Sequence, residues 1–271
     1  LLPEPYFPLY GPDATLVGGE AKYYPCLFDH EFIPQVADLE ALVDDRTVAI
    51  LYNFPSNPTG GTLNEQQRDD LLAFAAKHDL WIISDEVYDR IVFETEHVSF
   101  MGTGYDKLMV VNSFSKTFAM TGWRIGYIVS TNLEAMKQVV KIQYYISACS
   151  NDAMQYAVLE AMEKANDYPS MMATEFQKRC KLIVDRLNAM PGVQCHQPKG
   201  SIYVFPKVDV PGMSSEDVAL ELLKDGVLCS PGSAFGPSGE GHLRFAYTIG
   251  QDDIARGMDK VEATLTRLQQ G

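Results

Sequence analysis

The chain has 271 residues, and 46% of them are hydrophobic, which is enough to bury the cores of one large or two ordinary domains. Its 36 Asp and Glu residues outnumber its 22 Lys and Arg residues, so the net charge is -14. A surface this negative repels phosphate backbones and anionic lipid, which makes nucleic acid and membranes poor candidate partners. A small anion can still bind where a few cationic side chains and backbone N–H groups converge.

The five cysteines are scattered along the chain, without a C-x-x-C pair or a nearby His at the spacing of metal ligands. They predict reduced thiols in a cytoplasmic protein that has no metal site. No stretch approaches the roughly 18 consecutive apolar residues that a membrane-spanning helix needs.

Short apolar runs alternate with helical patterns from Thr47 onward. They predict strands at residues 47–52, 80–84, 108–112 and 125–130, and helices at residues 64–78 and 133–147. Asn64 can cap the first turn of the earlier helix. Strands separated by helices predict an α/β fold, with a mainly parallel sheet flanked by helices on both faces. Ligands of such sheets bind at the carboxyl ends of the strands.

The pattern changes after a Met-rich helical region at residues 151–190. Shorter elements follow from Gly200-Ser201-Ile202-Tyr203 onward, which predicts a second domain of the α+β class. We place the boundary near Asn166, so that residues 1–165 form a large domain and residues 166–271 form a C-terminal small domain.

Polar side chains follow two of the predicted strands. The loop after the first strand contains Asn57 between two X-Pro pairs that stiffen it. Held at the sheet edge, Asn57 can donate a hydrogen bond, although the same loop is also typical of an ordinary turn. The next strand ends in Asp85, and a carboxylate at the mouth of a buried strand is costly unless a cation meets it. Asp85 therefore needs a partner, or else it caps a helix.

The strand at residues 108–112 ends in the hydroxyls of Ser113 and Ser115 and in Lys116. Arg124 follows eight residues after Lys116. Its planar guanidinium group, placed beside the hydroxyls, can bind a phosphate or form a structural ion pair. The strand ends thus supply an acid, an amine, a phosphate clamp and an amide donor. Pyridoxal phosphate (PLP) requires this set, because a lysine forms its Schiff base, a carboxylate meets its ring nitrogen, and cations and hydroxyls hold its phosphate.

Four motifs resemble those of the class I/II aminotransferases of PLP fold type I, the aspartate aminotransferase-like enzymes. They are Asn57-Pro58-Thr59-Gly60, Asp85-Glu86-Val87-Tyr88, Ser113-Phe114-Ser115-Lys116 and Gly122-Trp123-Arg124-Ile125-Gly126. Their order and spacing match that family, and the similarity runs from Pro5 to the C-terminus. The resemblance implies an enzyme that transfers the amino group of an L-amino acid to a 2-oxo acid by a ping-pong route, using PLP as its cofactor.

The resemblance also implies roles for single residues. Lys116 forms the Schiff base and serves as the catalytic base. Asp85 pairs with the pyridine nitrogen, and Arg244 grips the α-carboxylate of the substrate together with Asn57. Asn57 and Tyr88 match the residues that bond the 3′ oxygen of the cofactor. Ser113, Ser115 and Arg124 match those that hold its phosphate. Phe7 matches the aromatic ring that stacks on its pyridine ring. The segment at residues 200–206 resembles a strand near the substrate entrance.

The chain also departs from the family pattern. Members carry roughly 100 further residues before this point. That part holds a strand, a turn whose backbone N–H groups bind the cofactor phosphate, and much of a homodimer contact. We therefore expect that the chain is a fragment of a homodimeric protein.

Two other functions stay open at this stage. Related fold type I enzymes, such as C–S lyases, share these motifs, because the motifs bind PLP without choosing which bond is broken. In some transcription regulators an aminotransferase-like domain without catalytic activity senses an effector behind a DNA-binding head. The identity of the amino acid and of the 2-oxo acid also stays open.

Overall fold

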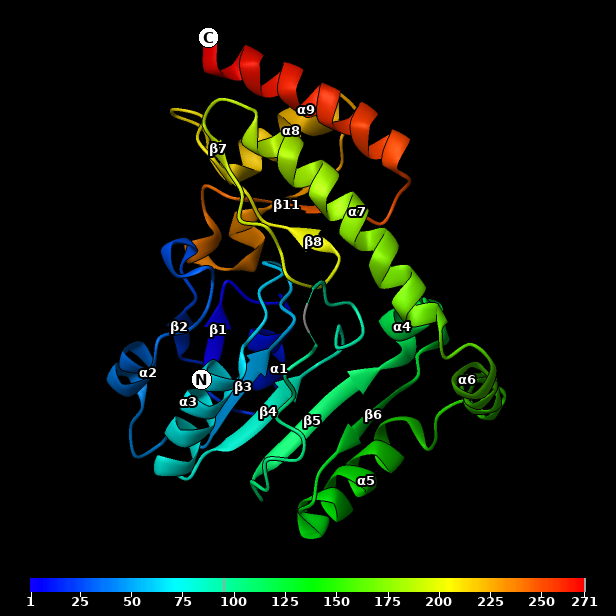
Figure 1. Ribbon diagram of the computed structural model, residues 1–271. Coiled ribbons are helices and arrows are strands. Elements are labelled where there is room, and N and C mark those ends of the chain that lie inside the picture. Colours follow the sequence, from blue (N-terminus) through cyan, green and yellow to red (C-terminus); the bar gives the residue numbers. More distant parts are fainter. Residues whose placement is uncertain (95, 271) are drawn as a thin grey trace.

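The structure is a computed structural model that describes residues 1–94 and 96–270 (Figure 1). Its largest sheet has four strands in the order β3-β4-β5-β6. β3, β4 and β5 run parallel, and β6 runs antiparallel to β5. The bounds are β3 (Ala49–Asn53), β4 (Trp81–Asp85), β5 (Leu108–Ser113) and β6 (Gly126–Val129). The predicted α/β fold with a mainly parallel sheet is therefore confirmed.

A short parallel pair extends the sheet beyond β3. It consists of β1 (Leu2–Glu4) and β2 (Tyr23–Pro25), with helix α1 (Tyr10–Leu16) between them in the chain. The backbone N–H of Leu51 donates to the Leu1 carbonyl oxygen at 3.0 Å, and the amino group of Leu1 donates to the Ala49 carbonyl oxygen at 2.6 Å. The start of the chain is thus fixed beside β3.

The two faces of the sheet differ in how they are covered. Successive strand residues point to opposite faces, and Ile50, Ile82 and Val110 lie in a core shared with Leu71 and Phe74 of α3. The helices of this part are α2 (Val36–Leu42) and α3 (Glu65–Lys77), with the short η1 (Phe28–His30) before them.

On the opposite face, Leu51, Ile83 and Val111 line a cavity of about 800 Å³ together with Ala14 and Val17 on or beside α1. We expected helices to cover both faces. Within the described residues this second face is only partly covered, because the short helix α1 stands off from it across the cavity. The side chains at the carboxyl end of this face are therefore accessible from the cavity.

Local signals set the ends of the helices. Asn64 caps α3 by accepting a hydrogen bond from the Gln67 N–H at 2.8 Å, and the Gln67 side chain accepts one from the Asn64 N–H at 2.9 Å. This reciprocal pair satisfies two N–H groups that the helix itself cannot bond. The predicted helix at 133–147 is α5 (Leu133–Ser147), and Asn132 caps it by accepting a hydrogen bond from the Ala135 N–H at 3.0 Å, without a reciprocal bond.

The C-terminal half packs around its own core, above the sheet in Figure 1. Its helices are α7 (Tyr168–Asn188), α8 (Ser215–Lys224) and α9 (Gln251–Gln270). The preceding helix, α6 (Asp152–Lys164), supplies no residue to this core and lies at the level of the large sheet in Figure 1. Its strands form an antiparallel sheet of β8 (Tyr203–Val204), β11 (Leu243–Ala246) and β10 (Ser230–Pro231), and a pair of β7 (Val193–Gln194) and β9 (Lys207–Val208). The remaining short helices are α4 (Phe114–Thr117), η2 (Thr121–Trp123), η3 (Gly232–Phe235) and η4 (Pro237–Gly239).

Contacts cross the predicted boundary in both directions. Tyr88 and Ile91, which follow β4, pack in the C-terminal core, whereas Phe205 and Phe235 pack in the core of the large sheet. The division at residue 166, which falls between α6 and α7, stays a prediction. These contacts bring the loops that follow β3 and β4 against β11 and β8, through Asn57 and Arg244 and through Tyr88 and Tyr203.

Within residues 1–94 and 96–270, no helix combines the length and the apolar character that crossing a membrane requires. No group of three His, Cys, Asp or Glu side chains there is placed to hold a metal ion.

Candidate active site

Asp85 ends β4, and two neutral donors hold its carboxylate. The Tyr10 hydroxyl donates to Oδ2 at 2.6 Å, and the Val87 N–H donates to Oδ1 at 3.2 Å. Burial raises the pKa of Asp85 above its usual value, while the hydrogen bonds from Tyr10 and Val87 oppose this rise. Burial also raises the pKa of Tyr10 well above its usual value, so its hydroxyl keeps its proton and remains a donor.

A chain of amide hydrogen bonds connects Asp85 to Arg244. The Asn53 side chain donates to the Asp85 carbonyl oxygen at 3.1 Å, and its Oδ1 accepts from the Asn57 N–H at 3.0 Å. Asn57 Oδ1 then accepts from Nη1 of Arg244 at 2.9 Å. Asn57 and Arg244 are 187 residues apart in the sequence, and the fold brings them into contact. Because its oxygen meets Arg244, Asn57 keeps Nδ2 as its donor end.

Arg244 lies between two aromatic rings. Its guanidinium carbon is 4.3 Å from the centre of the Tyr203 ring and 4.7 Å from that of Phe235. Its Nη2 donates to the Ser230 hydroxyl at 3.1 Å. Burial lowers the pKa of Arg244, but a guanidinium remains charged in proteins. A desolvated planar fork of this kind suits a carboxylate.

Tyr88 joins this cluster to Lys116. Its hydroxyl lies 3.4 Å from that of Tyr203, and its ring centre lies 5.8 Å from Nζ of Lys116. Burial raises the pKa of Tyr88, so its hydroxyl also remains a donor. Lys116 lies on α4, directly after β5, so its amine is located at the carboxyl end of that strand.

The predicted phosphate residues lie at the end of β5. The Ser113 hydroxyl lies 2.9 Å from that of Ser115, and it accepts from the Ser115 N–H at 3.1 Å. Ser113 pairs with Gly126 on β6, so the chain segment of Arg124 runs alongside. In the described part of the chain, Arg124 donates to the Thr121 carbonyl oxygen at 2.9 Å and makes no hydrogen bond to either serine.

Phe7 is half-buried, and its ring lies 5.5 Å from that of Tyr10 at an angle of 70°. Phe7 thus packs against Tyr10, whose hydroxyl donates to Asp85. Sequence reasoning missed Tyr10 itself, although its position three residues after Phe7 was a usable signal, since side chains that far apart can share one face of a turn. It also placed Tyr203 only within a segment near the substrate entrance, because nothing local indicates a contact with Arg244.

The chemistry of these groups fits PLP. Within the described residues Asp85 makes no ion pair, so a half-buried carboxylate that lines the cavity is available to a protonated ring nitrogen. The amine of Lys116, the paired hydroxyls of Ser113 and Ser115, and the donor end of Asn57 match the aldehyde, the phosphate and the 3′ oxygen in kind.

Comparisons with known proteins agree with this chemistry. Residues 1–261 match the family model described as Aminotransferase class I and II. An aspartate aminotransferase of Pyrococcus abyssi is 35% identical, over 98% of this chain and 69% of that protein. The aromatic-amino-acid aminotransferase 2 of Thermococcus litoralis is 34% identical, with the same coverage. A crystal structure of an aromatic aminotransferase from Pyrococcus horikoshii OT3 superposes with a TM-score of 0.93 at 34% identity, over 98% of this chain and 72% of that one. The chain therefore belongs to the aminotransferase class I and II family.

Proposed function

We propose that this chain binds PLP and substrate in an aminotransferase that moves the amino group of an L-amino acid to a 2-oxo acid. One observation carries the proposal: a half-buried carboxylate, Asp85, is held by neutral donors without an ion pair in the described part of the chain, and it lies at the same sheet edge as Lys116. Arg244 of β11 meets this edge through its hydrogen bond to Asn57. The family is PLP-dependent. When bound, PLP supplies the aldehyde that takes up the amino group and the ring that withdraws electrons from the substrate Cα.

The residues of the chain divide the remaining work. Lys116 holds the cofactor through Nζ, and the same amine takes the proton from the substrate Cα and returns it. Asp85 accepts a hydrogen bond from the ring nitrogen. Asn57 and Tyr88 donate to the 3′ oxygen. Phosphate and ring contacts come from Ser113, Ser115, Arg124 and Phe7.

Arg244 orients the substrate by binding its α-carboxylate with the guanidinium fork. The bond from Arg244 to Asn57 connects this site to the cofactor site, so the two molecules are positioned relative to each other. The rings of Tyr203 and Phe235 exclude water from the guanidinium and strengthen its attraction for the carboxylate.

The test begins with PLP added to the purified chain, followed by borohydride reduction and mass mapping of the labelled lysine. We expect the label on Lys116 and its loss in Lys116→Ala. The matched control is Lys137→Ala, which removes an exposed lysine of α5. A label spread over several lysines, or retained in Lys116→Ala, contradicts the proposal.

The reaction type needs a second measurement on the same preparation. A transaminase yields a 2-oxo acid from an amino acid only when an amino acceptor is present. A C–S lyase or a racemase acts without the acceptor, and an effector domain binds without turnover. We further propose a cytoplasmic homodimer, which sedimentation of the native protein tests.

A further inference from the structure

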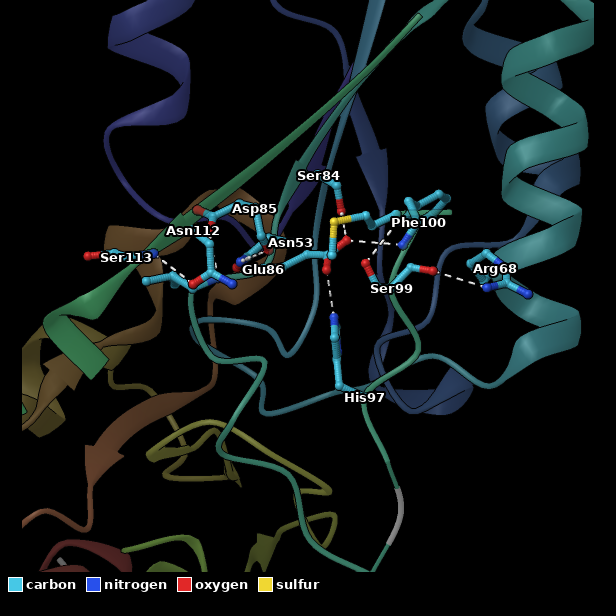
Figure 2. Close-up of polar contacts among 12 residues, drawn as sticks. Asn53, Arg68, Ser84, Asp85, Glu86, His97, Ser99, Phe100, Asn112 and Ser113 are labelled. Atoms are coloured by element: carbon cyan, nitrogen blue, oxygen red, sulfur yellow. Dashed lines mark hydrogen bonds and ion pairs between the residues drawn. The ribbon is translucent and has the colours of Figure 1, made fainter. Parts of the chain in front are cut away.

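The buried carboxylate of Glu86 directly follows Asp85 and is held by a network of its own (Figure 2). Only 3% of the Glu86 side chain is exposed. Its Oε1 accepts from the Ser84 hydroxyl at 2.8 Å and from the Phe100 N–H at 3.1 Å. Its Oε2 lies 2.8 Å from Nε2 of His97. All of these partners come from β4 or from the segment that joins β4 to β5.

This network fastens the connecting segment to the sheet. Phe100 stacks on Tyr52 of β3, with ring centres 5.1 Å apart and an angle of 8°. Arg68 of α3 donates to the Ser99 carbonyl oxygen at 3.0 Å. Glu86 therefore holds a segment that is also attached to β3 and α3, and its carboxylate is the point where that segment meets the end of β4.

The same residue fixes the peptide that presents Asp85. The Glu86 N–H donates to the Val111 carbonyl oxygen of β5 at 2.9 Å. On the other side, the Asp85 carbonyl oxygen accepts from the Asn53 side chain at 3.1 Å and from the Phe54 N–H at 3.2 Å. Successive strand residues point to opposite faces, so anchoring the Glu86 side chain sets the direction of the Asp85 side chain.

The two neighbouring carboxylates, Asp85 and Glu86, also differ in the groups that surround them. Burial alone would raise the pKa of Glu86, but the hydrogen bonds from His97, Ser99 and Ser84 bring it below its usual value. Glu86 thus stays ionised, held by polar partners that include His97, while Asp85 meets only neutral donors. Burying a charge costs free energy that its hydrogen bonds only offset, so stability alone is a weak reason for this network.

We propose that Glu86 and His97 are a positioning pair for the cofactor site, which hold the end of β4 so that the Asp85 carboxylate meets the ring nitrogen of PLP. The inference rests on the proposed function. It assigns no contact between the pair and the cofactor, because Glu86 acts through the backbone that it shares with Asp85.

The test compares the dissociation constant for PLP in wild type, His97→Ala and Glu86→Ala. We expect PLP to bind about tenfold more weakly in both variants, since losing a hydrogen bond to a charged group costs roughly that factor or more. Added imidazole should restore most of the affinity of His97→Ala, because 13% of the His97 side chain is exposed and the space it leaves can be refilled. Imidazole should not restore Glu86→Ala.

A matched control is available in a second Glu–His pair. His78 at the end of α3 lies 3.0 Å from Glu40 of α2, far from the strand ends that carry the site. His78→Ala should lower the thermal midpoint without changing the affinity for PLP. If His97→Ala also lowers the midpoint but binds PLP within about twofold of wild type, the pair is structural only and the inference fails.

Two further measurements keep the inference testable if an alanine variant does not fold. Glu86→Gln keeps an acceptor for Ser84 and Phe100 while it removes the charge, and an unchanged PLP affinity in this variant overturns the inference. With PLP labelled with ¹⁵N in the ring, the nitrogen signal should move toward the unprotonated form when Asp85 is displaced. If wild type itself fails to bind PLP, the proposed function fails. If wild type and the variants all bind PLP equally well, the proposed function stands and only this inference fails.

Discussion

At the scale of single residues, the contact between Tyr10 and Asp85 decides how the carboxylate is presented. A phenol that donates at 2.6 Å stabilises the ionised form and fixes its orientation. Burial pulls the pKa of Asp85 the other way. The balance between the two determines whether Asp85 can hold a protonated ring nitrogen.

Tyr10→Phe removes this donor and leaves the ring in place. We expect PLP affinity to fall about tenfold, because a hydrogen bond to a charged group contributes roughly 1.5–3 kcal/mol. Titration of PLP absorbance measures the effect. Tyr105→Phe is the control, since its hydroxyl meets the Leu80 carbonyl oxygen at 2.6 Å, remote from Asp85. Equal affinities in wild type and Tyr10→Phe would show that Asp85 needs no such support.

His242 offers a prediction about pH. Its ring stacks on Phe205 at 4.9 Å, and its Nε2 is buried without a partner in the described part of the chain. Burial lowers the pKa of His242 below its usual 6.5. The unfolded chain therefore takes up a proton near pH 6.5 that the folded chain resists, so this site costs stability below that pH and nothing well above it.

We expect His242→Phe to lose less thermal stability than wild type between about pH 7.5 and pH 5.5. The measurement is the midpoint of thermal unfolding at several pH values. His30→Phe is the control, because His30 is exposed. A fall in the midpoint that is equally steep in His242→Phe and in wild type would remove His242 as its cause.

At the scale of elements, caps and strand ends place the chemistry. α3 begins where Asn64 and Gln67 exchange hydrogen bonds, and the loop before it carries Asn57. β4 and β5 end in Asp85 and Ser113, which carry the next two motifs. Each of these three motifs thus follows the end of a strand of the large sheet.

Asn64→Ala should lower the free energy of unfolding by about 1 kcal/mol, the usual value of an N-cap. Urea unfolding followed by circular dichroism measures it. Gln66→Ala is a suitable control, since Gln66 bonds Asp70 on the exposed side of the same helix. A loss as large in Gln66→Ala would mean that general helix propensity, rather than the cap, accounts for the change.

At the scale of the whole molecule, much apolar surface is exposed around α5. Ile142 is 58% exposed and Ile146 is 75% exposed, and they lie one turn apart on the same side of α5. The face of the sheet that bears Leu51, Ile83 and Val111 adds the cavity described above. Soluble monomers rarely expose large contiguous apolar patches, and exposed apolar side chains that gather on one helix face favour association.

We therefore expect the 271-residue chain to bind a hydrophobic dye and to self-associate at micromolar concentration. Ile142→Glu combined with Ile146→Glu should reduce both effects and leave the unfolding midpoint nearly unchanged. Sedimentation velocity and dye fluorescence give the readouts. A monomer that does not bind the dye would contradict this expectation.

The sequence by itself determined the four strands of the large sheet, the helices α3 and α5, and the residues that stand at the ends of these strands. Periodicity and capping act over a few residues, so the pattern of apolar side chains around Ile82 or the Asn64 cap is readable without a structure. The family resemblance added the roles of Phe7 and Arg244, which no local pattern indicates.

Only the tertiary structure decided which of these residues touch. The bonds from Tyr10 to Asp85 and from Arg244 to Asn57 join residues 75 and 187 positions apart, and the Glu86–His97 pair depends on the path of a long connection. The antiparallel direction of β6 and the partly covered sheet face also emerged only there. Such features follow from how distant segments pack, and one sequence contains no measure of the distance between them.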